Sequence, residues 1–285
     1  MTAQARDRRV PRLAPVDRWT IGYAIVATLA LAWRWPAEPT GRELLALAHL
    51  LLITLALLAP RAREAGPLGA FLGEWYPIIL LIALYTEIGL LNIAGGLVHD
   101  PVVQRWETAL FGGQPSRDWI RAQSAWWLSW PLHLGYLAYY PIVVGAPLAL
   151  WVARRRDAAR QTILLTMVAY YVCYAVFLFF PVAGPRYAFA LASNDAAQSG
   201  VAVFTQGLLN GADSWGAAFP SSHVAAALVA SVSAGWGWRP LGWVLVPIAV
   251  LLAFGTVYGQ YHYAVDALAG AGLAGVILVA GYRRR

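Results

Sequence analysis

The chain has 285 residues, of which 60% are hydrophobic and only 12% are charged. Soluble domains carry roughly 25% charged residues, so this composition excludes an ordinary soluble protein and predicts an integral membrane protein. All 21 basic residues are Arg, and the net charge is +7. They lie in short clusters beside apolar runs and form no nucleic-acid-binding motif, which argues against nucleic acid as a partner.

Eight apolar runs follow one another along the chain, each with the length typical of a membrane-spanning helix. They cover residues 19–35, 43–60, 74–95, 130–152, 161–181, 220–237, 240–258 and 262–281. The predicted fold class is therefore all-α: a polytopic membrane helical bundle of about eight transmembrane helices, with a six-helix catalytic core. We expect residues 1–72 to form a charged tail with two extension helices, and residues 73–285 to form the core.

The distribution of Arg along the chain predicts its orientation. If the N-terminus is cytoplasmic and the eight runs alternate, 15 of the 21 Arg lie on the cytoplasmic side, as the positive-inside rule requires. Both termini are then cytoplasmic. The long loop 182–219 and the short turn 258–261 lie on the outer side, and we expect the loop to act as a lid or as a wall of the substrate entrance.

Residues 96–129 also lie outside in this arrangement. The segment contains the stretch Trp-Glu-Thr-Ala-Leu-Phe-Gly-Gly-Gln-Pro-Ser, which begins at Trp106. Aromatic and aliphatic residues mixed with charges predict short interfacial helices, with a break at Gly112–Gly113 and Pro115.

Three ionisable residues stand at the heads of two apolar runs on this outer side. His223 opens one run, and His262 and Asp266 open another. Such groups are costly near a membrane and are candidates for function. His262 and Asp266 are four residues apart, so a helix brings them to one face. A carboxylate there can accept the Nδ1 proton, which leaves Nε2 as a directed nucleophile.

His223 follows Pro220, Ser221 and Ser222, a typical helix start. The free N–H groups of such a helix end bind anions, and a protonated His223 can act as a general acid. Arg186, in Gly-Pro-Arg-Tyr, adds a permanent charge that matches phosphate oxygens. Phosphoryl transfer needs mainly positioning and charge neutralisation, so these residues together predict a phosphoryl-transfer site.

Other readings of these residues stay open. The two histidines and the aspartate could be structural, or could form a two-His, one-carboxylate metal site, although the nearby Arg and helix end favour an anion and predict no metal. Arg186 could be an interfacial anchor, and Ser221 could be a helix cap only. Five further residues are candidates for a substrate cavity: Tyr187, Tyr258, Tyr263, Glu87 and Asn92.

The order Gly-Pro-Arg-Tyr, Phe-Pro-Ser-Ser-His and His-Tyr-x-x-Asp-x-x-x-Gly, between apolar runs, resembles the type 2 phosphatidic acid phosphatase superfamily. The resemblance covers roughly residues 74–285 and is greatest for the branch of inositol phosphorylceramide synthases and their bacterial relatives. It implies that His262 is a nucleophile that forms a phosphohistidine, that Asp266 orients it and that His223 protonates the leaving group. It further implies that Arg186 and the amides of Ser221 and Ser222 hold the phosphate, without a metal or other cofactor.

Several positions depart from the phosphatase pattern. Phe179 stands where the phosphatases carry a Lys, and Thr256, after Gly255, stands where they carry an Arg. Tyr187 replaces a Pro, and Ser222 replaces a Gly. Two phosphate-binding cations are thus missing, which fits the transferase branch. A phosphodiester carries less charge than a monoester and needs fewer cations, so we expect a diester substrate.

The expected function is transfer of a phosphoryl-containing headgroup between lipids, or between a lipid and an alcohol, at the outer leaflet. The substrate is a phospholipid, a sphingolipid or a polyprenyl phosphate. One alternative is a lipid phosphate phosphatase that acts on phosphatidic acid or polyprenyl phosphate, and another is a non-catalytic lipid-binding scaffold or a transporter. The absence of Lys and the resemblance favour a bacterial inner membrane, with the site facing the periplasm or the exterior.

Overall fold

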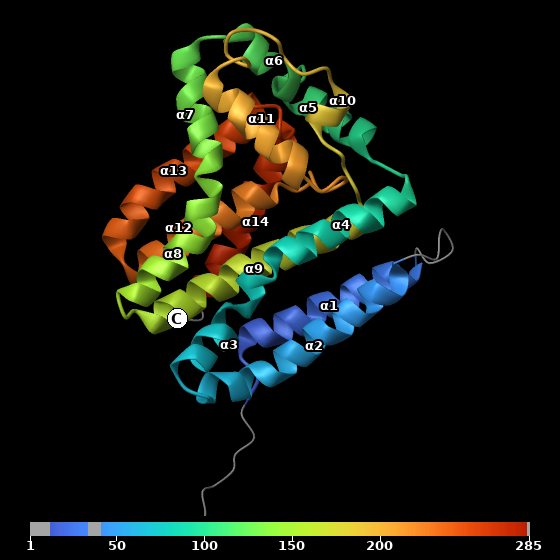
Figure 1. Cartoon of the computed structure of the whole chain (residues 1–285). Helices are drawn as coiled ribbons and strands as arrows, with labels where there is room; N and C mark the ends of the chain where they lie inside the picture. The colour runs from blue at the N-terminus through green and yellow to red at the C-terminus, as the bar shows by residue number, and fades with distance from the viewer. Residues whose placement is uncertain (1–11, 34–40, 284–285) are drawn as a thin grey trace, which may run out of the picture.

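The computed structural model describes residues 12–33 and 41–283, and the regular structure there is helical (Figure 1). The helices of the bundle are α1 (Pro15–Trp33), α2 (Arg42–Glu64), α3 (Pro67–Ile79), α4 (Leu81–Gly95), α7 (Trp126–Leu137), α8 (Tyr139–Val152), α9 (Arg156–Phe179), α12 (Ser222–Gly237), α13 (Arg239–Tyr258) and α14 (Ala264–Tyr282). The other described helices are α5 (Asp100–Phe111), α6 (Pro115–Ala122), α10 (Pro185–Ala188) and α11 (Gly200–Ala212). The all-α prediction is confirmed for the described residues.

The predicted runs and the observed helices differ in continuity. The run 74–95 is divided between α3 and α4, and the run 130–152 between α7 and α8, which are bent by 46°. Pro141 lies just beyond the second break, and it removes a backbone N–H that a straight helix would use there. Among the described residues, five helical stretches are long and apolar enough to cross a membrane when α3 and α4 are counted as one, or six if α7 and α8 also form one span. The count of eight and the six-helix core stay predictions.

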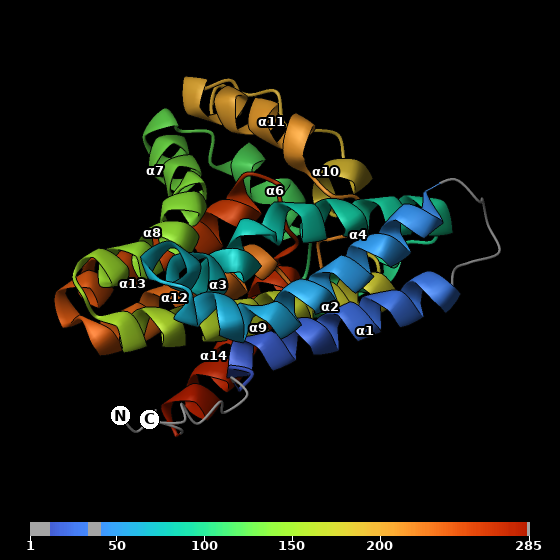
Figure 2. The ribbon, with the colours of Figure 1, turned by 60° about the horizontal axis from the view of Figure 1, so that its bottom comes forward.

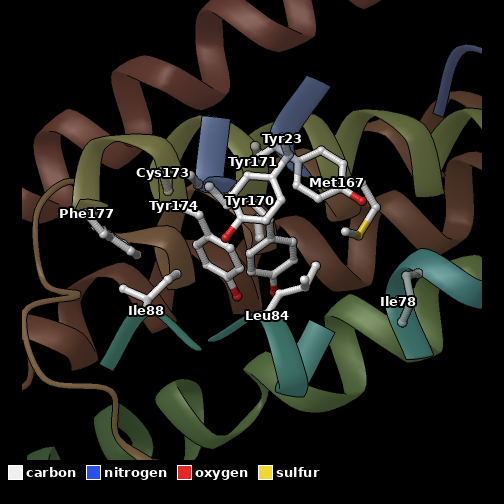
Figure 3. Packing of buried hydrophobic residues seen from close by; sticks show 14 of the residues in the cluster. Tyr23, Ile78, Leu84, Ile88, Met167, Tyr170, Tyr171, Cys173, Tyr174 and Phe177 are labelled. Carbon is white, nitrogen blue, oxygen red and sulfur yellow. The ribbon is translucent and has the colours of Figure 1, made fainter. Parts of the chain in front are cut away.

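The core is built around α9 and α12. Helix α12 packs against α8, α9, α13 and α14, and its buried face is rich in Ala, which lets the neighbouring backbones approach closely. The other face of α9 meets α1, α3 and α4 in an aromatic cluster that includes Tyr23, Tyr171 and Tyr174 (Figure 3). The rings of Tyr23 and Tyr171 are stacked with their centroids 5.1 Å apart.

Two helices at the N-terminal side are joined to the rest by buried polar contacts. α1 and α2 lie side by side along α9 and α4 (Figure 1). Thr20 and Tyr171 share a hydrogen bond of 2.8 Å between α1 and α9. Glu87 on α4 pairs with His49 on α2, and both side chains are buried. The division into residues 1–72 and 73–285 stays a prediction, and part of the tail lies outside the described residues.

Helices α5, α6, α10 and α11 gather at one end of the bundle, where α9 ends and where α12 and α14 begin (Figures 1 and 2). The short helices predicted within 96–129 are present as α5 and α6, with the break at Gly112, whose φ is 73°. Their interfacial position stays a prediction. The segment 182–219 contains α10 and α11. The end of the bundle that carries α5, α6, α10 and α11 therefore contains the predicted catalytic and phosphate-binding residues, whereas the cavity candidate Glu87 lies within α4.

Candidate functional site

His262 lies in the short turn between α13 and α14. The backbone N–H groups of Tyr261 and His262 both donate to the carbonyl of Thr256, at 2.9 and 3.0 Å. These two bonds close the turn and hold the imidazole inside the protein, where only 4% of the residue is exposed. The sequence Gly-Gln-Tyr-His is thus folded back onto the end of α13, and Gln260 takes a left-handed φ of 61° to make the reversal.

A hydrogen-bond chain passes through both predicted catalytic histidines. His262 Nδ1 lies 3.0 Å from the carbonyl oxygen of Ala218, which can only accept, so Nδ1 carries the proton and Nε2 carries the lone pair. Nε2 lies 3.4 Å from His223 Nδ1, and His223 Nε2 lies 3.4 Å from the Tyr136 hydroxyl. Only one set of tautomers avoids facing lone pairs: Tyr136 donates to His223, His223 to His262, and His262 to Ala218.

Asp266 lies beside His262, but it does not accept the Nδ1 proton as the sequence predicted. Its Oδ2 lies 3.5 Å from His262 Nδ1 and accepts the Tyr263 N–H at 2.8 Å, so it caps the first turn of α14. Its Oδ1 has no hydrogen-bond partner among the described residues, and the residue is fully buried. The Nδ1 proton therefore goes to a backbone carbonyl, and the carboxylate is left close to the imidazole edge.

The protonation of His262 follows from its surroundings. Burial lowers the pKa of His262 from 6.5 to about 4, while the Asp213 carboxylate and the Ala218 carbonyl act in the opposite direction. Desolvation disfavours the charged imidazolium, and here it outweighs the two favourable interactions. His262 is consequently neutral at pH 7, which is the state that a nitrogen nucleophile needs.

Arg186 is brought to the same place by the start of α10. The N–H groups of Ala183 and Gly184 both donate to Asp100 on α5, at 2.8 Å each, and Gly184 has a φ of 102° that favours glycine. The guanidinium donates to Asn210 Oδ1 at 2.7 Å and to Asp213 Oδ2 at 3.4 Å. Its side chain is only 8% exposed.

One small cavity joins these groups. It is lined by Tyr85, Tyr136, Arg186, Asp213, His223, Tyr261 and His262, among others, and its volume is about 20 Å³. That volume suits a single water molecule, so a lipid phosphate enters only if the side chains move apart. Two larger grooves, of about 800 and 710 Å³, follow α1 and α9 and contain neither histidine.

The serines of the Phe-Pro-Ser-Ser-His motif do not face this cavity. The Ser221 N–H donates to the Asp266 carbonyl at 2.9 Å, and the Ser221 hydroxyl accepts the Val224 N–H at 3.3 Å as a helix cap. Both Ser221 and Ser222 are buried. The expectation that their amides hold a phosphate is therefore corrected for Ser221, because its N–H already ties α12 to α14.

The five cavity candidates are scattered. Only Tyr187 adjoins the cavity, since its hydroxyl donates to Asp213 Oδ2 at 3.1 Å. Tyr258 donates to the Gln123 carbonyl at 2.7 Å, and Tyr263 donates to Asp100 Oδ1 at 2.9 Å. Glu87 pairs with His49, away from the histidine cavity.

Asn92 has a structural position instead. Its amide donates to the carbonyls of Phe177, Trp215 and Gly216, at 3.2 to 3.4 Å. Gly216 has a φ of 83°, and a Cβ there would lie 2.5 Å from Asn92 Nδ2. Asn92 thus fixes the segment whose next residues include Ala218, the acceptor of the His262 proton.

Sequence reasoning missed the acidic residues that hold the site together. Asp100 accepts from both the Arg186 segment and Tyr263. Glu107 accepts the Ala264 N–H at 3.0 Å, and burial raises its pKa. Asp213 bonds to Arg186. All three lie in the segments 96–129 and 182–219, which the sequence predicts to be on the outer side, but no motif marked them.

No group of three His, Cys, Asp or Glu side chains within residues 12–33 and 41–283 could hold a metal ion. Comparison with known proteins adds one finding: the sequence model of a family described as the PAP2 superfamily matches residues 103–280. Arg186, His223, His262 and Asp266 all fall within the match. No curated protein and no solved structure matches the chain.

Proposed function

This chain belongs to the PAP2 superfamily, and on that premise we propose that it transfers a phosphoryl-containing headgroup through a phosphohistidine at His262. The membership itself indicates phosphatase or phosphotransferase activity on a lipid-like substrate, and several long apolar helices indicate an integral membrane protein. The acceptor is a second lipid or an alcohol. The reaction takes place at the outer leaflet of a bacterial inner membrane, with both termini cytoplasmic.

The observation that carries this proposal is the hydrogen bond of His262 to Ala218. Because Nδ1 is held as a donor to a carbonyl at 3.0 Å, the lone pair of Nε2 points toward the side where His223 and the cavity lie. A buried, neutral imidazole with a fixed tautomer and a directed lone pair is an activated nucleophile. Arg186 lines the same cavity and supplies a guanidinium for the phosphate.

In the first half-reaction, Nε2 of His262 attacks phosphorus while the bond from phosphorus to the lipid alkoxide breaks. The negative charge of the bound anion favours protonation of the nearby His223, which is therefore an imidazolium in the complex. The alkoxide takes its proton from this imidazolium. The products are the free lipid alcohol, neutral His223 and a phosphohistidine. Positive charge that develops on the His262 ring is stabilised by the Asp266 carboxylate, 3.5 Å from Nδ1.

In the second half-reaction, neutral His223 takes the proton from the acceptor hydroxyl. The acceptor oxygen attacks phosphorus, the bond from phosphorus to Nε2 breaks, and His262 returns to its starting state. Because the same steps work with water in place of an alcohol, transfer and hydrolysis differ only in the molecule that reaches the phosphohistidine.

The surroundings of two positions support a diester substrate over a monoester. Phe179, where phosphatases carry a Lys, is 46% exposed and stacks on Trp33 at 5.8 Å. Thr256, where they carry an Arg, is buried and donates to the Ala253 carbonyl. Neither adds a polar group to the cavity, so a bound phosphate meets Arg186 as the one permanent cation among the described lining residues.

The test is an assay of the purified wild type and of His262→Ala in detergent micelles with a panel of phospholipids. Headgroup products and inorganic phosphate are measured together, with and without ceramide, diacylglycerol or polyol acceptors. Acceptor-dependent transfer that is lost in His262→Ala supports the proposal. Phosphate release without an acceptor, equally lost, identifies a phosphatase. Vanadate should inhibit either enzyme and leave a scaffold or a transporter unaffected.

A further inference from the structure

Asp213 holds a carboxylate beside the phosphate-binding cation. It is the first residue after α11, and its Oδ2 accepts from Arg186 Nη1 at 3.4 Å and from the Tyr187 hydroxyl at 3.1 Å. Its Oδ1 accepts from the Tyr85 hydroxyl at 3.1 Å. The residue lines the cavity that also contains His223 and His262. Three donors from two different regions thus fix this negative charge within the site.

The charges of the described cavity wall nearly cancel. In the free protein, Arg186 and Asp213 are its charged side chains, and His262 is neutral at pH 7. The Arg186 side chain is 8% exposed and that of Asp213 is 21% exposed, so water screens the pair weakly. Coulomb energy grows in proportion to charge. The repulsion between Asp213 and a phosphate bound at Arg186 is therefore twice as large for a dianion as for a monoanion.

We propose that Asp213 is a specificity-determining residue that disfavours doubly charged phosphomonoesters at Arg186 and favours singly charged phosphodiesters. The proposal rests on the proposed function to the extent that substrate phosphate binds between Arg186 and His262. A monoester carries a charge of about −1.5 to −2 at neutral pH, whereas a diester carries a single charge. The preference for diesters follows because the Asp213 carboxylate and the substrate phosphate share one guanidinium, that of Arg186.

Two isosteric substitutions at the same guanidinium change the charge in opposite directions. Asp213→Asn removes one negative charge and keeps an oxygen that can accept. Asn210→Asp adds one, at the residue whose Oδ1 already accepts from Arg186 at 2.7 Å. Asp195→Asn makes the same change as Asp213→Asn at an exposed position of the same outer segment, and it serves as the matched control.

The first measurement is binding, by titration calorimetry of the full-length protein in detergent at about pH 8. Inorganic phosphate is the dianionic probe and diethyl phosphate the monoanionic one. We expect Asp213→Asn to raise the affinity for phosphate relative to diethyl phosphate by about tenfold or more, Asn210→Asp to lower that ratio, and Asp195→Asn to leave it unchanged. If Asp213→Asn does not fold, Asn210→Asp still tests the direction.

The proposal is overturned if the ratio stays constant in the folded variants, if both anions change equally, or if Asn210→Asp raises the ratio. Turnover of short-chain phosphatidic acid and phosphatidylglycerol separates this result from the proposed function. Turnover that depends on His262, with an unchanged ratio, rejects the role of Asp213 alone. A ratio that changes as expected, without any His262-dependent turnover, supports the role of Asp213 and rejects the proposed reaction.

Discussion

His262 and His223 contact each other directly, with Nε2 of the first 3.4 Å from Nδ1 of the second. The Nδ1 proton of His223 thereby covers the lone pair that would attack phosphorus. A phosphorus atom bonded to Nε2 must take the place of this contact, so the two rings separate when substrate enters. The cavity, of about 20 Å³, is too small for a phosphate, so its walls must also move apart when substrate binds.

Replacing the nucleophile should abolish transfer. We expect His262→Ala to lower the rate by about 10³-fold or more and to remove a phosphohistidine that can be trapped from a radiolabelled lipid. His99→Ala is the matched control, because the His99 ring stacks on Phe180 at 4.3 Å and does not line the histidine cavity. Trapped label in His262→Ala would place the nucleophile elsewhere.

The stability of the fold should depend on pH through His262. Its pKa falls from 6.5 in the unfolded chain to about 4 in the folded protein, so the unfolded chain binds the proton first as the pH drops. The neutral His262 therefore contributes its full stabilisation to the folded state above pH 6.5, and this contribution is lost as the pH falls from 6.5 to about 4. His262→Asn lacks this group, and its melting temperature should fall less than that of the wild type between about pH 7 and pH 5.

The same comparison contains its own control. Above about pH 7.5, His262 is neutral in both folded and unfolded chains, so wild type and His262→Asn should show equal pH dependence there. Equal dependence between pH 7 and 5 as well would mean that His262 is exposed to water and not buried as described.

Asp100 should act as a positioning residue for both halves of the site. It accepts from Ala183 and Gly184, next to Arg186, and from Tyr263, next to His262. Asp100→Asn turns an N–H toward these donors, and we expect a loss of about 1–3 kcal/mol in unfolding free energy with a fall of kcat of about 10²-fold.

Two further variants interpret that result. Tyr263→Phe removes one of the three donors to Asp100, so its effect on kcat should be smaller. Asp118→Asn removes a half-exposed carboxylate of α6 that pairs with Arg117, and it should have little effect. A variant Asp100→Asn that melts earlier but keeps the wild-type kcat when folded would show a purely structural role.

Glu87 should matter for stability and not for the reaction. It forms a buried pair with His49 between α4 and α2. Glu87→Ala removes the partner of His49 Nε2 and leaves Thr28 at Nδ1, and breaking a buried pair costs about 3–5 kcal/mol. Melting temperatures of Glu87→Ala, His49→Ala and the double variant should show strong coupling, while folded Glu87→Ala keeps its transfer rate. Loss of transfer without loss of stability would mean that Glu87 contacts the substrate after all.

Removal of metal ions should leave the reaction unchanged. The described site offers one guanidinium and the imidazoles of two histidines to a phosphate, and phosphoryl transfer can proceed by positioning and charge stabilisation from such groups. We expect equal transfer rates before and after dialysis against EDTA. A loss that added Zn²⁺ or Mg²⁺ restores would support a two-His, one-carboxylate metal site.

The sequence by itself determined the class of the protein and the identity of the central residues. Apolar runs and few charges predict a helical membrane protein, since unpaired backbone groups are excluded from lipid. The spacing of His262 and Asp266 predicted that a helix brings them to one face. In the structure α14 begins at Ala264 and His262 lies in the turn before it, yet the two side chains still meet at 3.5 Å. His223 was singled out because it is an ionisable residue at the head of an apolar run.

Only the tertiary structure decided which partner each of these groups uses. Ala218, Asp213 and Asp100 belong to loops and short helices far from His262 in sequence, and their contacts depend on how the chain folds back on itself. The His262 proton goes to the Ala218 carbonyl at 3.0 Å, because the nearest Asp266 oxygen lies at 3.5 Å and already accepts the Tyr263 N–H. Glu87 does not line the histidine cavity because its carboxylate pairs with His49 of α2. Hydrogen bonds between distant segments follow packing, which local patterns do not encode.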